Sequence, residues 1–285
     1  MLLSRTCFGS DKEFCKMLSL AGYKAVDLND TTNTDLFHKS EYEYMSFLEN
    51  AIKNVFDAGL IIGQCHAPHT GTYWNSTSED IEYRIVAIEN CIKAANKLDI
   101  PYTVVHPLVY AFNKPDNDFV KNWKMNVDIL RRISPYAKGT VLCLENMPGV
   151  GGVIRSGEDM SKMLSDVGNN SLMVCFDTGH LISQEIKSSD FFAAVGDKIK
   201  VLHIHDSIKD QDLHLLAGTG NGDWDDFKNT LKQYDYQGNI NSESVFVYKT
   251  PKELQLEGQI LECKILNNFI TKNDFLRGVS FEKRA

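Results

Sequence analysis

The chain lacks the features that attach a protein to a membrane or to a nucleic-acid backbone. No stretch approaches the run of about 20 apolar residues that spans a bilayer. The N-terminal segment MLLSRTCFGS also lacks the apolar core of a secretory signal. The formal net charge is −8, whereas a nonspecific grip on phosphates needs clustered lysine and arginine. We therefore expect a cytoplasmic protein with no membrane contact and no nucleic-acid partner.

A cysteine framework is missing as well. The cysteines number seven, which is odd, and no two have the Cys-x-x-Cys spacing. Cys65, Cys143 and Cys175 lie inside apolar runs. This pattern favours buried, reduced thiols over disulfides or a cysteine-based zinc site.

The chain has no proline-, glycine- or serine-rich linker, and no glycine-rich phosphate loop follows its first apolar run, which ends at Cys7. The missing phosphate loop disfavours an open, doubly wound sheet. Apolar runs instead alternate with helical patterns over all 285 residues, a common length for one barrel. Many runs are apolar at consecutive positions, which indicates strands buried on both faces. We predict an α/β fold, a (β/α)8 TIM barrel, formed as a single domain by residues 1–285.

Eight strands and the helices between them follow from this pattern. The strands are expected at 2–7, 25–28, 60–65, 103–106, 141–145, 173–176, 201–204 and 239–245. Helical spacing of apolar residues is clearest at 81–98, after the capping residues 76–79, at 122–137 and at 158–168, which ends on Gly168. Residues 251–281 should form the last helix and a tail.

Histidines and carboxylates recur at the carboxyl ends of the expected strands. Six of the eight histidines lie within a few residues of the end of an apolar run. In a barrel these strand ends meet on one face, where functional groups gather. The strand ends and the loop after the seventh strand present His66, His106, Glu145, Asp177, His180, His203, His205, Asp206, Asp212, His214 and Glu243.

Four of these residues, from the fifth to the eighth strand, could surround one ion: Glu145, Asp177, His203 and Glu243. Such a carboxylate-rich set suits a divalent cation such as Mn²⁺, Zn²⁺, Co²⁺ or Mg²⁺. We expect no organic cofactor. Each residue also has a structural interpretation, such as a buried salt bridge for Glu145 or a turn cap for Asp177. We favour the metal, because burying several acidic groups together without a cation is costly.

Other residues carry weaker signals. Gly218-Thr219-Gly220 lacks the lysine and the preceding strand of a phosphate loop, so we interpret it as a tight loop that leads into a helix near Asp223. A role at the substrate and a structural role both stay open for Asn29, Asp30, His69, Tyr73, Trp74 and His205.

Taken in order, the motifs CHAPH, VVHP, LENMPG, FDTGH and HIHD resemble the xylose isomerase-like TIM-barrel superfamily. The resemblance covers almost the whole chain and ends at Glu243 in the eighth strand. This superfamily includes sugar isomerases and epimerases, and also the endonuclease IV type of DNA-repair enzyme.

The isomerase and epimerase branch implies one divalent metal held by Glu145, Asp177, His203 and Glu243. By the same resemblance, Glu145 and Glu243 would be the catalytic acid and base. One glutamate would remove a proton beside a carbonyl of an open-chain sugar, and the other would return one, through a metal-stabilised enediolate. His66, His180 and His106 would bind the substrate. A hydride shift is the open alternative to proton transfer.

The endonuclease IV branch implies three zinc ions with nine ligands. Its pattern matches this chain at His66, His106, Glu145, Asp177, His180, His203, Asp212, His214 and Glu243. Against it, residues 203–214 contain no arginine and the chain is acidic.

We therefore expect first an isomerase or epimerase of a small sugar, sugar phosphate or related keto-polyol, with a small sugar-like molecule as its partner. A multinuclear zinc phosphodiesterase that repairs abasic-site DNA is the alternative, and an inactive metal-binding protein is the third. Homo-oligomer formation is left open.

Overall fold

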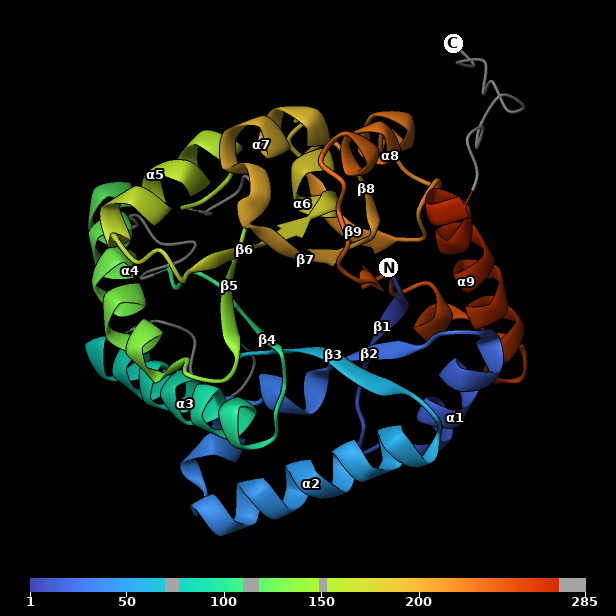
Figure 1. Cartoon of the computed structure of the whole chain (residues 1–285), viewed down its shortest axis with the longest axis horizontal. Coiled ribbons are helices and arrows are strands. Elements are labelled where there is room, and N and C mark those ends of the chain that lie inside the picture. Colours follow the sequence, from blue (N-terminus) through green and yellow to red (C-terminus); the bar gives the residue numbers. More distant parts are fainter. Residues whose placement is uncertain (70–76, 110–117, 149–152, 272–285) are drawn as a thin grey trace.

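Eight parallel strands form a ring with helices around it (Figure 1). The structure is a computed structural model, and it describes residues 1–69, 77–109, 118–148 and 153–271. In chain order the ring strands are β1 (Leu3–Cys7), β2 (Ala25–Leu28), β3 (Ile61–His66), β4 (Tyr102–Val105), β5 (Val141–Glu145), β6 (Met173–Asp177), β7 (Ile199–His203) and β10 (Ile240–Ser242).

The ring closes on itself through backbone pairing. Strands that are consecutive in the ring are hydrogen-bonded neighbours, and β10 pairs with β1, with Leu3 opposite Ile240. Between β7 and β10, the Ile204 amide donates to the Asn241 carbonyl at 2.8 Å, and the Glu243 amide donates to the Ile204 carbonyl at 3.0 Å. The predicted TIM barrel is confirmed.

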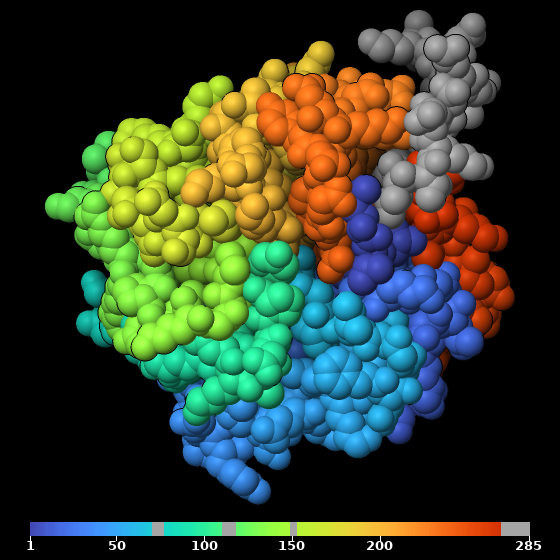
Figure 2. All heavy atoms as spheres, viewed as in Figure 1, coloured from blue at the N-terminus to red at the C-terminus, as the bar shows by residue number. Residues whose placement is uncertain are grey.

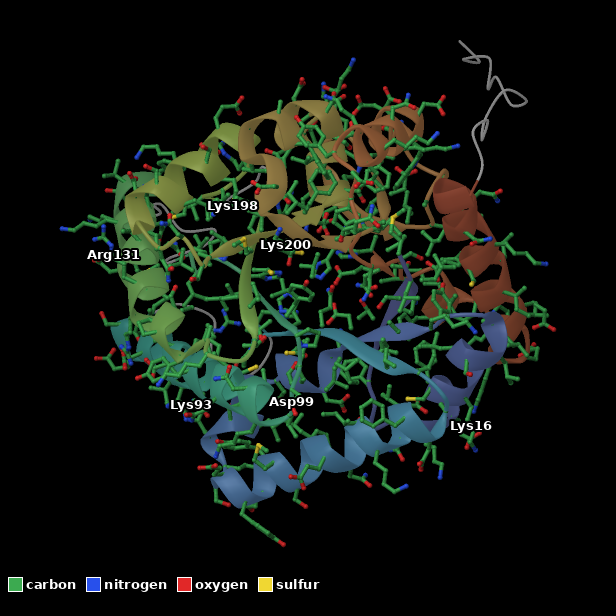
Figure 3. All side chains as sticks on the ribbon, viewed as in Figure 1. Lys16, Lys93, Asp99, Arg131, Lys198 and Lys200 are labelled. Carbon is green, nitrogen blue, oxygen red and sulfur yellow. The ribbon has the colours of Figure 1, made fainter. Side chains whose placement is uncertain are left out.

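Nine helices are present in the described part of the chain. They are α1 (Lys12–Ala21), α2 (Glu41–Asp57), α3 (Ser78–Lys97), α4 (Phe119–Ile133), α5 (Gly157–Val167), α6 (Thr178–Ile182), α7 (Ser188–Val195), α8 (Trp224–Gln233) and α9 (Gln255–Thr271). The cationic side chains labelled on α1, α3 and α4, namely Lys16, Lys93 and Arg131, belong to this outer layer (Figure 3). No described helix is both long and apolar enough to cross a membrane.

The interior of the ring is packed. Side chains alternate between the two faces of a strand, so every second residue points to the barrel axis. Val104, Cys143, Cys175 and Val201 form a buried cluster on β4 to β7, separate from the larger core between strands and helices. In the space-filling view, atoms occupy the centre of the ring (Figure 2). The barrel is therefore a packed core and not a pore.

Local capping explains where the predicted helices begin and end. Helix α3 starts with a capping box between Thr77 and Asp80, and α5 starts with one between Ser156 and Asp159. Helix α5 ends on Gly168, whose φ of 71° is left-handed, as expected for a glycine after a helix. Thr77 belongs to the predicted capping segment 76–79, of which residue 76 lies outside the described residues.

Several predicted boundaries differ from the structure. The seventh strand is Ile199–His203 instead of 201–204, and the eighth is Ile240–Ser242 instead of 239–245. The segment expected as a loop after the seventh strand contains an antiparallel hairpin of β8 (Asp206–Ile208) and β9 (Gln211–Leu215). A left-handed residue at its turn, Asp210 with φ 59°, lets these short strands pair. Residues 272–285 of the expected tail lie outside the described residues, so the single domain over 1–285 stays a prediction.

The cysteines lie where their apolar surroundings indicated. All seven are buried and free. The expected burial of the thiols is confirmed, and their reduced state stays a prediction.

Candidate metal centre

Three carboxylates and one imidazole meet at the carboxyl ends of the ring strands. Glu145, Asp177 and His203 are the last residues of β5, β6 and β7, and Glu243 follows β10. Strand alternation places the first three one step above Cys143, Cys175 and Val201 of the inner cluster. The potential ligand atoms of the four residues all lie within 4.8 Å of one another. We call these four residues the quartet.

The imidazole of His203 is oriented by residues deeper in the barrel. Its Nε2 lies 3.3 Å from Asp27 Oδ2 and 2.9 Å from Gln64 Nε2. If the Nε2 proton points to Asp27, the lone pair of the ring lies on Nδ1. This is the arrangement in which a carboxylate behind a histidine fixes the tautomer for metal binding.

The other nitrogen of His203 faces the two glutamates. His203 Nδ1 is 3.2 Å from Glu145 Oε1 and 3.2 Å from Glu243 Oε1. It is nevertheless a buried atom with no hydrogen bond within the described part of the chain. A buried nitrogen without a partner, among acceptor oxygens, fits a divalent cation bound between them.

Asp177 is fixed from two sides. Its Oδ2 is 3.1 Å from His205 Nε2. The Asn146 side chain pairs with the Asp177 backbone, since Oδ1 accepts from the amide at 2.8 Å and Nδ2 donates to the carbonyl at 3.0 Å. A Cβ at Gly179 would overlap the His205 ring, so the glycine of FDTGH is required for this packing.

A second group consists of imidazoles beside the quartet. His66, His69 and His106 form a cluster that could hold an ion. His66 Nε2 is 3.1 Å from His106 Nε2, and both rings approach Glu145 Oε2, at 3.3 Å and 3.1 Å respectively. Glu145 therefore lies between this group and the quartet.

A third group is completed by the β8–β9 hairpin. It contains His180, His205, Asp212 and His214. His180 Nε2 is 3.3 Å from Asp212 Oδ2, and His214 Nε2 is 3.4 Å from the same oxygen. A hydrogen bond connects the hairpin to the segment after β10, because the Val245 amide donates to the His214 carbonyl at 2.8 Å.

The three groups differ in their balance of charge. The quartet has three carboxylates for one imidazole, whereas the third group has one carboxylate for three imidazoles. The carboxylates of the quartet are also approached from outside by His66, His106, His180 and His205, at 3.1–3.6 Å. Three carboxylates and one imidazole whose ligand atoms converge are nevertheless ligands of the kinds that divalent cations take. The donor set of the quartet therefore fits a divalent ion.

Burial and neighbouring charges shift the pKa values in the site. Burial would raise the pKa of Glu145, but His203 and His106 hold it well below its usual value, whereas burial raises the pKa of Glu243. Burial lowers the pKa of His106 to about 4. Burial opposes the charged form of His180 too, yet Asp177, Asp212 and Glu145 together raise its pKa to about 10.

Asp206 has a structural role. Its carboxylate accepts hydrogen bonds from the backbone amides of Ser207, Gly218, Gly220 and Gly222 and from Trp224 Nε1, all at 2.8–3.0 Å. The glycine-rich loop thus wraps a carboxylate of its own chain. It leads into α8, whose N-cap is Asp223, so the interpretation as a tight loop agrees with the structure.

A cavity of about 410 Å³ opens above the quartet. His66, His106, His180, Asp212 and His214 line it, together with Glu145 and Glu243. Glu243 is 13% exposed and Glu145 only 1%, so Glu243 is the more accessible of the two from the cavity.

Cations contribute little to this cavity. Arg5 is the only lysine or arginine among the described lining residues. Its guanidinium already contacts Ser242 Oγ at 2.9 Å and Glu262 Oε1 at 3.4 Å.

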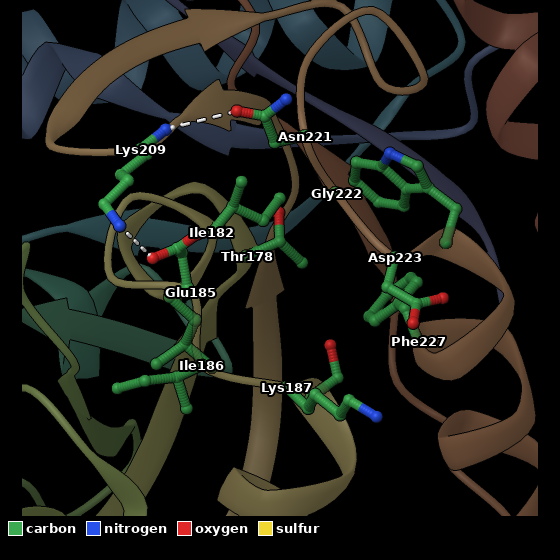
Figure 4. A pocket seen from close by; sticks show the side chains of 13 residues that line it. Thr178, Ile182, Glu185, Ile186, Lys187, Lys209, Asn221, Gly222, Asp223 and Phe227 are labelled. Atoms are coloured by element: carbon green, nitrogen blue, oxygen red, sulfur yellow. Dashed lines mark hydrogen bonds and ion pairs between the residues drawn. The ribbon is translucent and has the colours of Figure 1, made fainter. Parts of the chain in front are cut away.

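A second cavity, of about 490 Å³, lies beside α6 and the start of α8 (Figure 4). Lys209 pairs there with Glu185. None of its thirteen described lining residues belongs to the quartet or to the other two groups. It is therefore separate from the candidate metal centre.

The structure brings together all nine residues of the expected ligand pattern, while their catalytic and binding roles stay proposals. His205 contacts Asp177 and not open solvent. Asp30 accepts from the Gly9 and Ser10 amides and so shapes the loop after β1. Tyr73 and Trp74 lie outside the described residues.

Sequence reasoning missed Asp27, Gln64 and Asn146. Asp27 offered one signal, a charged residue in the middle of the apolar run Ala25–Leu28, because such residues are rarely buried without a partner.

Comparison with known sequences identifies relatives of two kinds. A probable endonuclease 4 of Metamycoplasma arthritidis is 26% identical over 198 residues, covering 66% of this chain and 69% of the relative. An uncharacterised protein of Methanocaldococcus jannaschii is 26% identical over 217 residues, covering 73% of this chain and 72% of the relative.

Solved structures with the same fold include sugar epimerases. D-psicose 3-epimerase, crystallised in the presence of D-fructose, has a TM-score of 0.72 at 15% identity, covering 95% of this chain and 99% of its own. The 3-keto-D-glucoside 4-epimerase of E. coli has a TM-score of 0.73 at 16% identity, covering 93% and 98%. The IOLI protein, with a bound zinc atom, has a TM-score of 0.71 at 17% identity, covering 94% and 97%. At these identities the likeness establishes the fold alone.

The family model described as xylose isomerase-like TIM barrel matches residues 15–259. This match spans every ring strand except β1 and includes all the residues of the candidate metal centre. The chain therefore belongs to the xylose isomerase-like TIM-barrel family.

Proposed function

We propose that this protein is a divalent-metal-dependent isomerase or epimerase of a small, uncharged sugar or keto-polyol. The observation that carries the proposal is the convergence of Glu145 and Glu243 on His203 Nδ1, each at 3.2 Å. When bound to the quartet, a divalent cation would polarise a carbonyl and a neighbouring hydroxyl and so lower the cost of an enediolate.

The two glutamates provide the proton transfers. They come from different sides of the ring, Glu145 from β5 and Glu243 from the end of β10. One carboxylate takes the proton from the carbon beside the carbonyl. The other carboxyl group delivers a proton to the opposite face of the same carbon, which epimerises the sugar. Delivery to the former carbonyl carbon isomerises it instead, with the proton of the neighbouring hydroxyl passing to the former carbonyl oxygen. The number of protons on substrate and protein together is unchanged.

The imidazoles of the cavity wall orient the substrate. His66, His106 and His180 all line the cavity beside Glu145. Their ring nitrogens can donate to or accept from the hydroxyls of an open-chain sugar. Fixed donors of this kind hold the reacting carbon near both carboxylates without rearrangement of solvent.

The charge of the lining favours an uncharged substrate. Its one described arginine, Arg5, is already engaged with Glu262 and Ser242. A sugar phosphate would find no free lysine or arginine among these residues. The named epimerases of the same fold, one crystallised with D-fructose and one acting on a glucoside, support a neutral sugar.

Exchange of solvent deuterium into a ketose tests the proposal. Glu145→Gln and Glu243→Gln keep the shape of each side chain but remove its capacity to carry the proton. We expect deuterium incorporation from D2O, measured by NMR at saturating metal, to fall by about 100-fold or more in either variant. Glu185→Gln, outside the site, is the control. Full incorporation in both site variants would show that these glutamates do not transfer the proton.

A second candidate function, a multinuclear phosphodiesterase, is favoured by one specific observation. The two further groups, around His66 and around His180, both adjoin Glu145 of the quartet, and the ligand atoms within each group lie in binding range of one another. The relative named probable endonuclease 4 supports the same candidate.

Cleavage of abasic-site DNA tests this second candidate. It predicts about three zinc ions per chain, as in the endonuclease pattern, and nicking of a duplex with a single abasic site. Asp212→Asn should then abolish nicking, because Asp212 is the only carboxylate of the third group. An intact duplex after incubation with the zinc-loaded chain would exclude the activity.

A further inference from the structure

A groove of about 860 Å³ lies between helix α2 and the loops that follow β1 and β2. One wall consists of the loops after β1 and β2, including Phe8 and Asn29. The other wall is one face of α2, where Glu43, Ser46, Phe47 and Asn50 follow each other at helical spacing. We call this region the α2 groove.

The α2 groove adjoins the cavity above the quartet, because Phe8 and Asn29 line both. A molecule that binds at the quartet and in the groove together would pass over these two residues.

The surface of the groove suits a carbohydrate ring. Phe8 and Phe47 are 46% and 40% exposed, so each offers an uncovered aromatic surface. Near the junction, the polar residue Asn29 lines both cavities. An aromatic surface next to a polar residue matches the apolar and hydroxyl faces of a sugar.

The charges of the groove argue against a phosphate. Lys39 is the only cationic side chain among its described lining residues, against the carboxylates of Asp30, Asp35 and Glu43. These carboxylates are themselves engaged, by the Gly9 and Ser10 amides, by Tyr83 and by Ser40 respectively. A phosphorylated sugar or a nucleic-acid strand would meet excess negative charge here.

We propose that the α2 groove binds a second, uncharged sugar ring, so that the substrate is a disaccharide or another glycoside with its reacting ketose at the quartet. This assignment rests on the proposed function, whose site supplies the first ring. The groove would then set the size of the substrate.

Glucosyl-fructoses provide the test. The metal-loaded full chain is incubated in D2O with D-fructose and, separately, with turanose, maltulose and isomaltulose, which join the same two sugars by different linkages. We expect kcat/KM for deuterium incorporation to be higher for at least one disaccharide than for D-fructose. Phe47→Ala should lower that value by about tenfold, while the value for D-fructose stays unchanged.

Phe56→Ala is the matched control. Phe56 also lies on α2 and is 57% exposed, but it does not line the groove. The Phe56→Ala substitution should change neither the kcat/KM for the disaccharide nor that for D-fructose. Equal kcat/KM values for D-fructose and all three disaccharides, or an equal loss for both kinds of sugar in Phe47→Ala, would overturn the assignment.

Binding separates this inference from the proposed function. In saturation-transfer NMR, the glucosyl ring of a bound disaccharide should receive magnetisation from the protein and lose it in Phe47→Ala. If this pattern appears without deuterium incorporation, the groove stands and the proposed function fails. The groove assignment is wrong if the glucosyl ring gives no signal with the unmodified chain. It is also wrong if a phosphorylated sugar reduces that signal more strongly than the same sugar without phosphate.

Discussion

At the scale of the residue, the orientation of His203 decides the chemistry of the site. Its Nε2 faces Asp27 at 3.3 Å, and its Nδ1 faces Glu145 and Glu243 at 3.2 Å. With the Nε2 proton directed to Asp27, the lone pair of the ring lies on Nδ1, where it faces the position of a cation. A side chain that does not reach the cavity can in this way control what the cavity binds.

Replacing Asp27 by asparagine tests this control. The Asp27→Asn substitution keeps the volume of the side chain but removes the charge behind His203. We expect the affinity for Mn²⁺ or Zn²⁺, measured by competition with a chelating dye, to fall by about 10–100-fold. Asp57→Asn on the exposed end of α2 should leave the affinity unchanged. An unchanged affinity in Asp27→Asn would show that His203 needs no positioning.

Residues at strand ends could be recognised from the sequence, whereas inside the strands only Asp27 gave a signal, as a charged residue in an apolar run. Each member of the quartet stands at or just beyond the end of its run, so its position on the functional face follows from the barrel alone. Asp27 and Gln64 lie within β2 and β3. Their role depends on contact across the barrel with His203, which is more than a hundred residues away. Nothing in the local sequence indicates that contact.

At the scale of the element, the hairpin β8–β9 and the loop after it form one unit around Asp206. Asp212 and His214 lie on β9 and reach the site only when the hairpin is folded. The Asp206 carboxylate joins the start of the hairpin to the glycine loop and to Trp224 of α8. The Asp206 carboxylate therefore stabilises the segment that carries Asp212 and His214 of the third group, and it does not itself bind the substrate.

Asp206→Asn should weaken this unit. An amide has one acceptor oxygen, and its NH2 group would face donors such as Gly220 and Trp224. We expect the free energy of unfolding in urea to fall by about 2 kcal/mol or more, since hydrogen bonds to a charged group contribute about 1.5–3 kcal/mol each. Asp223→Asn replaces one favourable N-cap residue by another, so it should lower the free energy of unfolding only slightly. Equal stabilities for the two variants would contradict the structural role of Asp206.

The elements themselves were predictable where one signal dominated. Helix α5 has both a capping box and a terminal glycine, and its predicted range of 158–168 is nearly the observed one. The β8–β9 hairpin was missed because its strands have only three and five residues and are mostly polar. Short polar strands lack the apolar run that marks the ring strands, and their pairing depends on the turn at Asp210.

At the scale of the whole molecule, a buried ion pair links the two ends of the chain. Arg5 of β1 and Glu262 of α9 are 0% and 1% exposed, with Nη1 and Oε1 3.4 Å apart. Ser242 of β10 bridges them, since Arg5 donates to its Oγ at 2.9 Å and its Oγ donates to Glu262 Oε1 at 2.6 Å. First strand, last ring strand and last helix are thus held together where the ring closes.

Removing one charge of this pair should destabilise the barrel. Glu262→Gln leaves the Arg5 guanidinium buried without its counter-charge, and breaking a buried pair costs about 3–5 kcal/mol. We expect this loss in the free energy of unfolding, measured by denaturant titration. Glu257→Gln, on the exposed side of the same helix, should have a negligible effect. A neutral result for Glu262→Gln would mean that solvent or another group replaces the lost charge.

Location and assembly also belong to this scale. The cytoplasmic location stays a prediction, and homo-oligomer formation is left open. The absence of a nucleic-acid partner depends on the choice between the two candidate functions. Family and fold followed from the order of the motifs along the chain, because a barrel turns that order into a ring of neighbouring strand ends.

Anomalous diffraction from a crystal of the Mn²⁺-loaded chain tests the central claim most directly. We predict one strong peak per chain, enclosed by Glu145, Asp177, His203 and Glu243, whose potential ligand atoms all lie within 4.8 Å of one another. An empty quartet would contradict the metal centre itself. Three peaks of equal strength would contradict the single-ion isomerase and favour the phosphodiesterase.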